Sequence, residues 1–126
     1  MIDPGDLLDE AKDLARAGHG REVRRRSAIS RAYYAAFHQA EAAARTAGYR
    51  FDRKAGTGMH AHLIAYLRGS GLPGLKGAAG ILNALKDMRT LADYRLHDNV
   101  AMLSVKEAIE HADFLLTEIL PPPEAG

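Results

Sequence analysis

Apolar side chains recur every three or four residues along most of the 126-residue chain, and no segment alternates strictly between apolar and polar positions. The first pattern is typical of amphipathic helices, whereas the second would indicate strands. Asp3 followed by Pro4 is a typical helix start, with the aspartate at the N-cap and the proline at the first helical position. The pattern predicts one helix from there to Gly18 and Gly20, and a second over 22–47 that ends at Gly48.

The second half of the chain shows the same helical period, interrupted by turns rich in glycine and proline. Ser104 followed by Glu107 matches a capping box, in which the serine caps a helix and the glutamate reaches back to the serine amide. The pattern predicts a loop over 49–58, a short helix over 60–69, a turn over 69–74, a long helix over 75–96, a loop at 97–99, and a last helix from Ser104 to the prolines at 121–123.

These elements predict an all-α fold, an up-and-down antiparallel bundle of four longer helices plus a short one. Residues 1–120 form a single helical domain in this interpretation, and 121–126 form a frayed, proline-rich tail. On the second helix, Tyr33 and Phe37 share a face with several alanines, which let a neighbouring helix approach closely. We therefore expect both rings in the core.

The composition excludes several classes of site. The chain has no cysteine, which removes disulfides, thiolate nucleophiles and zinc–thiolate centres. Its net charge is only +1, so no global field draws it to nucleic acid. No stretch approaches the length of a membrane span, and the acidic start MIDPGDLLDE does not resemble a signal peptide. We expect a cytoplasmic protein that carries no cofactor.

The positive charge is concentrated in one short run. Five arginines fall between residues 21 and 31, and Arg26 and Arg31 among them lie next to the aromatic segment of the second helix. A local basic patch of this kind can hold phosphate groups. The alternative is a solvated helix start whose arginines pair with the acidic residues of the first helix.

Arg89, Asp93 and His97 follow one another at intervals of four residues, so they share one face if the helix continues that far. The arginine would then hold a phosphate, the histidine would move a proton, and the aspartate would orient either of them. Such groups can cleave RNA without a metal, with the 2′-hydroxyl as nucleophile. The alternative is an ordinary helix ion pair between Arg89 and Asp93, with His97 in the exit loop.

The other histidines have ordinary roles as alternatives. His60 and His62 share a face only in an extended segment, where they would suit a metal ion. No carboxylate cluster accompanies them in the sequence, so we expect no metal site. His38 is either a functional group or a hydrogen-bond partner for a tyrosine hydroxyl.

Two segments together resemble a known family. SAISRAYYAAFHQAEAA at 27–43 resembles the second helix of HEPN-domain proteins, especially those of the small single-domain bacterial branch, and RTLADYRL at 89–96 resembles their Arg-x-x-Ala-Asp-Tyr segment. The resemblance covers 7–120 and implies a helical bundle that commonly forms a homodimer. Many HEPN proteins are metal-independent ribonucleases of toxin–antitoxin or other defence systems, and others are inactive partners of a minimal nucleotidyltransferase.

The active members share a signature of an arginine, a polar residue and, a few residues later, a histidine. Arg89 and Thr90 match its start, but His97 lies further along than the signature allows. Tyr94, Arg95 and Leu96 stand at the spacing where the histidine is expected, and Tyr94 would be a poor substitute for it. The resemblance therefore favours a binding protein that acts with a nucleotidyltransferase. The alternatives are a metal-independent endoribonuclease with a non-standard site, and a module that binds RNA or a nucleotide.

The resemblance and the residue pattern select the same candidate site. Because Leu85, Met88, Leu91 and Ala92 supply a buried stripe, Arg89 and Asp93 are expected at the edge of the late helix. They would face a polar cleft shared with the second helix, close to the dimer axis that the family implies. The candidate catalytic residues are Arg89, Asp93, Tyr94 and His97, and the candidate binding residues are Arg26, Ser30, Arg31, Tyr34 and His38.

Overall fold

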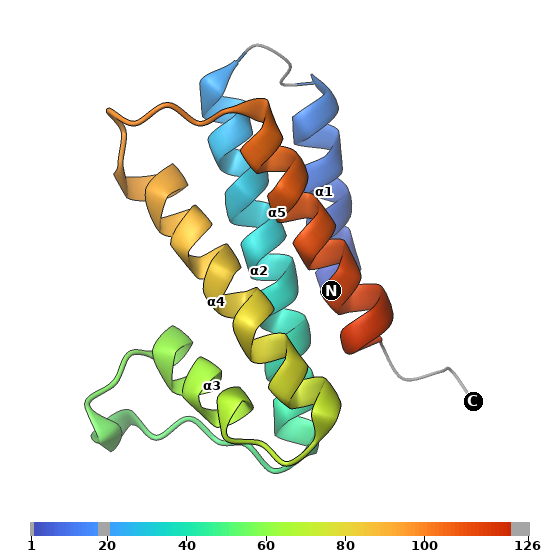
Figure 1. Cartoon of the computed structure of the whole chain (residues 1–126), viewed down its shortest axis with the longest axis vertical. Helices are drawn as coiled ribbons and strands as arrows, with labels where there is room; N and C mark the ends of the chain where they lie inside the picture. The colour runs from blue at the N-terminus through green and yellow to red at the C-terminus, as the bar shows by residue number, and fades with distance from the viewer. Residues whose placement is uncertain (1, 18–20, 122–126) are drawn as a thin grey trace.

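The computed structural model describes residues 2–17 and 21–121, which form an all-α bundle without any strand (Figure 1). Of the four longer helices, α1 and α4 run in one direction, and α2 and α5 run in the other. The predicted up-and-down bundle, with one short helix, is confirmed. The elements are α1 (Pro4–Ala17), α2 (Glu22–Thr46), the 3-10 turn η1 (Arg53–Ala55), α3 (Met59–Arg68), α4 (Pro73–Tyr94), α5 (Met102–Phe114) and the π-helical segment η2 (Leu115–Ile119).

The central helix of the bundle is α2, which contacts each of the other helices. Its alanines at 28, 32, 35, 36, 40 and 44 are all buried, so the neighbouring helices approach its backbone closely. Tyr33 is fully buried and Phe37 is 3% exposed, which confirms both as core residues. The two rings fill space that the small side chains leave open.

Local hydrogen bonds explain where the first two helices begin and end. Asp3 caps α1, because its Oδ1 accepts the Asp6 amide at 3.0 Å and its own amide donates to Asp6 Oδ2. The predicted stops at Gly18 and Gly20 lie outside the described residues. At the end of α2, Gly48 adopts a left-handed φ of +108°, and the Tyr49 amide donates to the Ala44 carbonyl at 2.9 Å. This Schellman turn delivers the buried Tyr49 side chain towards α3.

The start of the last helix differs from the prediction. Helix α5 begins at Met102 with Ala101 as its N-cap, so Ser104 already lies inside the first turn and caps nothing. The reason is the anchoring of Val100, which is 1% exposed: its amide donates to Glu22 Oε1, and its carbonyl accepts from Arg25. Because the chain is fixed at Val100, the helix starts immediately after it, and the predicted capping box is wrong.

The last helix also ends in a way that the sequence does not indicate. Its final turn, Leu115–Ile119, is π-helical, and the Leu120 amide donates to the Leu115 carbonyl at 2.8 Å. The wider turn places Leu116 and Leu120 in the buried set. Of the predicted frayed tail, only Pro121 belongs to the described residues, and it is exposed and outside any helix.

Candidate functional site

Helix α4 carries Arg89 on a side that faces α2. Its buried residues include Leu82, Leu85 and Ala92, and Arg89 lies on the border of this stripe with a side chain that is 12% exposed. Leu91, which the sequence places in the stripe, is instead 38% exposed. Arg89 is therefore more deeply buried than a residue at the edge of a helix face is expected to be.

The Arg89 guanidinium is held against aromatic rings. Its Cζ atom lies 5.3 Å from the ring centroid of Tyr33, 5.7 Å from that of Tyr34 and 5.6 Å from that of Tyr94, which is within the range of cation–π attraction. Two of these rings come from α2, and the third is the last residue of α4. The three rings fix the direction of the guanidinium.

One carboxylate faces this cation. Arg89 Nη1 lies 3.5 Å from Asp93 Oδ2, and the Ser30 hydroxyl donates to the same oxygen at 3.4 Å. Arg89 Nε is buried and has no hydrogen-bond partner in the described part of the chain. Burial by itself lowers the pKa of the guanidinium, but the neighbouring Tyr34, Tyr94 and Asp93 outweigh this effect and raise it, so the group stays charged.

His60, at the start of α3, belongs to the same cluster. Its Nδ1 is hydrogen-bonded to the Tyr33 hydroxyl, and its ring stacks on Tyr33 with a centroid distance of 5.5 Å. The Phe37 ring lies 4.5 Å away. Partial burial, together with the positive charges of Arg89 and Lys86, lowers the pKa of His60 below its usual value, so the imidazole is neutral at neutral pH.

These side chains define what we call the Arg89 site, at the junction of α2, α3 and α4. It combines a charged donor with an unpartnered N–H, a neutral imidazole and hydroxyl groups, which together suit the binding of an anion. The site consists of Ser30, Tyr33, Tyr34, His60, Arg89, Asp93 and Tyr94.

The structure brings most of the predicted residues together. Ser30, Tyr34, Asp93 and Tyr94 all lie against Arg89 or its carboxylate partner, in a polar setting shared with α2 as expected. His38 lies at the edge, with its ring 6.1 Å from that of Tyr34.

Three predicted residues lie away from the Arg89 site, and two of them are exposed. His97 is exposed and follows the end of α4 at Tyr94, so the shared helix face does not extend to it. Arg31 is exposed on α2 and lines a hollow with Asp6 and Glu10 of α1. Neither side chain reaches the Arg89 site.

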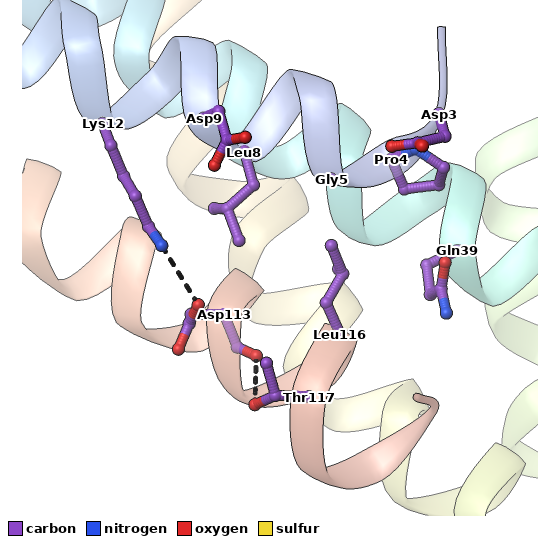
Figure 2. Close-up of a pocket in the computed structure, with 10 residues that line it drawn as sticks. All are labelled: Asp3, Pro4, Gly5, Leu8, Asp9, Lys12, Gln39, Asp113, Leu116 and Thr117. Carbon is purple, nitrogen blue, oxygen red and sulfur yellow. Dashed lines mark hydrogen bonds and ion pairs between the residues drawn. The ribbon is translucent and has the colours of Figure 1, made fainter. Parts of the chain in front are cut away.

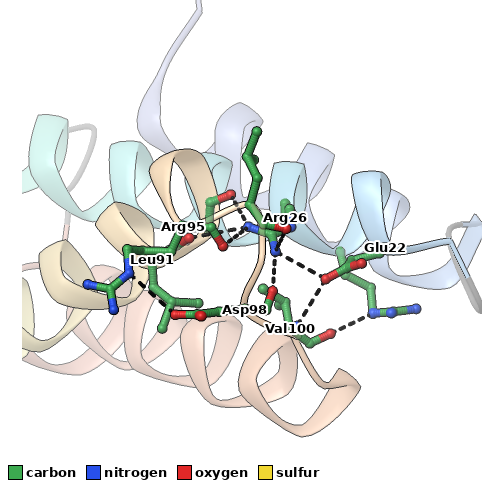
Figure 3. A network of polar contacts seen from close by, with 9 residues as sticks. Glu22, Arg26, Leu91, Arg95, Asp98 and Val100 are labelled. Carbon is green, nitrogen blue, oxygen red and sulfur yellow. Dashed lines mark hydrogen bonds and ion pairs between the residues drawn. The ribbon is translucent and has the colours of Figure 1, made fainter.

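Arg26 has a structural role in place of the predicted binding role (Figure 3). It is buried, and its guanidinium donates to the backbone carbonyls of the last turn of α4 and of the following loop, at Leu91, Ala92, Arg95, Leu96 and Asp98. Its remaining partner is Glu22, at 3.1 Å. The final carbonyls of a helix lack intrahelical partners, so Arg26 acts as a cap for α4.

The basic run as a whole follows neither predicted alternative fully. Arg25 also donates to a backbone carbonyl, that of Val100, at 2.8 Å. Two of the five arginines thus hold the connection between α4 and α5 instead of pairing with the acids of α1 or presenting a continuous phosphate surface. Arg89, in contrast, has a side chain that is 12% exposed and faces three rings and a single carboxylate.

A separate hollow lies between α1 and α5 (Figure 2). Its volume is about 380 Å³, its floor includes Leu8 and Leu116, and Lys12 forms an ion pair with Asp113 at 3.3 Å across it. Asp3 and Asp9 add two further carboxylates to its lining. The hollow shares no residue with the Arg89 site, and its acidic lining does not suit a phosphate.

Sequence reasoning missed His60 and Tyr33 as site residues. A signal was present, since a buried tyrosine hydroxyl needs a hydrogen-bond partner. The sequence does not reveal that a histidine 27 positions further along supplies it. Within residues 2–17 and 21–121, no three histidine, aspartate or glutamate side chains come together as a metal site would require, and no helix is long and apolar enough to cross a membrane.

Comparison with known proteins identifies the family. The sequence model that describes the HEPN domain family matches residues 5–120, which is nearly the whole chain. No curated protein and no solved structure matches it. The matched range spans all of the described helices apart from the first residue of α1, and it contains both segments of the Arg89 site on α2 and α4. The chain therefore belongs to the HEPN-domain family.

Proposed function

We propose that this HEPN protein acts by binding, and that the Arg89 site recognises a phosphate group of RNA or of a nucleotide. The observation that carries the proposal is the state of Arg89, which is largely buried, held by three tyrosine rings and left with an unpartnered Nε. Arginine binds phosphate oxygens through two N–H groups at once. A phosphate would replace Asp93 as the counter-charge, because the two anions repel each other and compete for the same donors.

The biological setting that we propose comes from the family. Some HEPN proteins are inactive partners of a minimal nucleotidyltransferase, and members of the family commonly form homodimers. The spacing of Arg89 and His97 departs from the catalytic signature in this chain, and His97 lies beyond the end of α4. These facts support a role as a binding partner of such a nucleotidyltransferase.

The ligand proposal is tested by measuring the affinity of the purified protein for a short single-stranded RNA and, in a second arm, for ATP. We expect Arg89→Gln to weaken binding of the true ligand about tenfold or more, since a hydrogen bond to a charged group contributes roughly 1.5–3 kcal/mol. Arg31→Gln, an exposed arginine outside the site, is the matched control. Equal affinity of wild type and Arg89→Gln for both probes would exclude the proposal.

The partner proposal needs a separate experiment. The genes beside this one are first searched for a minimal nucleotidyltransferase. The protein is then co-expressed with that nucleotidyltransferase, and the mass of the purified species is measured by light scattering. We expect a complex that contains two copies of this chain. A monomer at micromolar concentration that does not co-elute with the nucleotidyltransferase would contradict both the homodimer and the partnership.

A second candidate function is metal-independent cleavage of RNA. The observation that favours it is His60, a neutral imidazole against the same rings as Arg89, because a neutral imidazole can accept a proton from a 2′-hydroxyl. RNA is incubated with the protein and a chelator, beside Arg89→Ala. Cleavage by the wild type alone would support the enzyme, whereas equal cleavage by both proteins, or by neither, would count against it.

A further inference from the structure

His60 and Arg89 come from different helices but lie against the same two rings. The centroid of the His60 ring is 5.5 Å from that of Tyr33 and 6.0 Å from that of Tyr34. The Arg89 Cζ atom is 5.3 Å and 5.7 Å from the same two centroids. Helix α3 packs beside α4 and α2, and this packing brings the histidine into the cluster (Figure 1).

The hydrogen bonding of His60 leaves one ring nitrogen for a ligand. Nδ1 is bonded to the Tyr33 hydroxyl, which fixes the orientation of the ring, and this is the hydrogen bond that His60 makes within the described residues. Tyr33 is buried, and burial raises the pKa of its hydroxyl, so Tyr33 keeps its proton and pairs with Nδ1 as donor or acceptor according to the tautomer of the ring. In the protonated ring both nitrogens carry a hydrogen, so Nδ1 donates to the Tyr33 hydroxyl and Nε2 is the donor for a ligand.

His62, two residues further along α3, provides an internal comparison. Its Nδ1 is also hydrogen-bonded to a tyrosine hydroxyl, that of Tyr49, at 2.9 Å. Its Nε2, however, accepts the Asp52 amide at 3.4 Å, and its ring packs against Phe51 and not against an arginine. Both histidines therefore pair with a tyrosine hydroxyl, but their surroundings differ, and His60 is the one that lies against the same rings as Arg89.

We propose that His60 is the second anion-binding group of the Arg89 site, and that it takes up a proton when a phosphate group binds. The affinity for the ligand therefore rises as the pH falls. This inference rests on the proposed function, since it assumes that Arg89 binds a phosphate. It adds a residue that has no place in the arginine–histidine signature and links binding to the protonation of the protein.

The charges that face His60 explain the direction of the effect. Helix α2 contributes Tyr33, His38 and Glu41, and α4 contributes Lys86 and Arg89. Burial lowers the pKa of His60 most, Arg89 and Lys86 lower it further, and Glu41 opposes them. A phosphate between Arg89 and His60 adds a negative charge that favours the imidazolium. The pKa of His60 is thus higher in the complex, and binding tightens as the pH falls from the bound pKa to the free pKa.

The test uses a short oligouridylate without a terminal phosphate, because neither its phosphodiesters nor its bases titrate between about pH 8 and about pH 5.5. We expect the wild-type affinity to rise about tenfold over this range, which is the order of a charge-assisted hydrogen bond. We expect His60→Asn to bind with nearly constant affinity. Asparagine places an acceptor where Nδ1 stands, so the bond to Tyr33 is kept while the titrating group is lost.

His62→Asn is the matched control, because it replaces the other histidine of the same helix whose Nδ1 is bonded to a tyrosine, and it should keep the wild-type pH dependence. A flat wild-type profile, or an equal slope in His60→Asn, would overturn the inference. Arg89→Gln should bind weakly at every pH, and if it binds like the wild type, the phosphate proposal fails instead. Should His60→Asn not fold, the His60 pKa is followed by proton NMR in the wild type, where no rise on ligand addition would overturn the inference.

Discussion

Two arginines of this bundle are buried to almost the same extent but are used in opposite ways. The side chain of Arg26 is 10% exposed and that of Arg89 is 12% exposed. Arg26 donates to five backbone carbonyls and one carboxylate, whereas Arg89 faces three tyrosine rings and one carboxylate. Burial alone therefore does not separate the capping arginine from the arginine of the proposed binding site.

The number of satisfied donors does separate them. A guanidinium whose N–H groups all meet acceptors of the protein lowers the free energy of the folded state and has nothing to offer a ligand. A guanidinium held by rings, with Nε buried and unpartnered, carries a desolvation cost that a ligand can offset. The comparison predicts that substitution of Arg26 changes mainly the free energy of unfolding, whereas substitution of Arg89 changes mainly the affinity for a ligand.

The largest expected effect concerns Phe37, whose buried ring packs against Tyr33 and His60 of the Arg89 site. Phe37→Ala should lower the free energy of unfolding by about 3–5 kcal/mol, because it removes a buried ring and leaves a cavity. Urea denaturation measures the change. Phe114→Ala, at a ring that is 48% exposed, is the control and should cost much less. A loss below ~1 kcal/mol at Phe37 would show that this ring is not part of the core.

Arg26→Met addresses the saturated arginine. The variant keeps an apolar stem but leaves the carbonyls at the end of α4 without their donor, so we expect a loss of about 2–4 kcal/mol in unfolding free energy. Arg31→Met, on the exposed side of the same helix, should change stability by less than ~0.5 kcal/mol. Similar small losses in both variants would remove the structural role of Arg26.

Arg89→Met makes the opposite prediction. We expect a stability change below ~1 kcal/mol, because the desolvation cost of the cation disappears together with its ring contacts. The same variant should lose phosphate binding, so stability and affinity are measured on one preparation. A destabilisation as large as that of Arg26→Met would mean that Arg89, too, is chiefly structural, and it would contradict the proposed difference between the two arginines.

The smallest effect concerns Glu22, the carboxylate partner of Arg26. The Val100 amide and then the Arg26 guanidinium hold its pKa below the ordinary value of 4.5. A lowered pKa contributes stability above 4.5 that is lost as the pH falls through the folded-state value. We therefore expect the difference between wild type and Glu22→Gln in denaturation midpoint to shrink on acidification below about pH 4.5. A difference that is constant or growing would contradict the role of this carboxylate.

The fold was predictable because its determinants are local. The spacing of alanines around Tyr33 and Phe37, the Asp3–Pro4 start and the Gly48 stop each specify a feature within a few residues. The start of α5 could not be predicted in this way, because it depends on the contact between Val100 and Glu22, which are 78 positions apart. The contact of Val100 with Glu22 therefore decides where α5 begins, and the local capping signal at Ser104 does not.

The candidate site was predictable only in part, for the same reason. Ser30, Tyr34, Asp93 and Tyr94 follow from the registers of two helices and gather around Arg89. The distinction between Arg26 and Arg89 depends on which carbonyls lie within reach, and no sequence pattern encodes that. His60 enters through the packing of the short helix α3, so its neighbourhood is a property of the tertiary structure.

Three of the five tyrosines lie against Arg89, so tyrosine fluorescence is a natural probe of this site. The chain has no tryptophan and five tyrosines, so its ultraviolet emission comes from tyrosine alone. Tyr33, Tyr34 and Tyr94 pack on the Arg89 guanidinium, while the other two, Tyr49 and Tyr66, pack on each other with centroids 4.8 Å apart. We therefore expect tyrosine emission to change when a ligand binds the proposed site, with Tyr49→Phe and Tyr66→Phe used to lower the background emission.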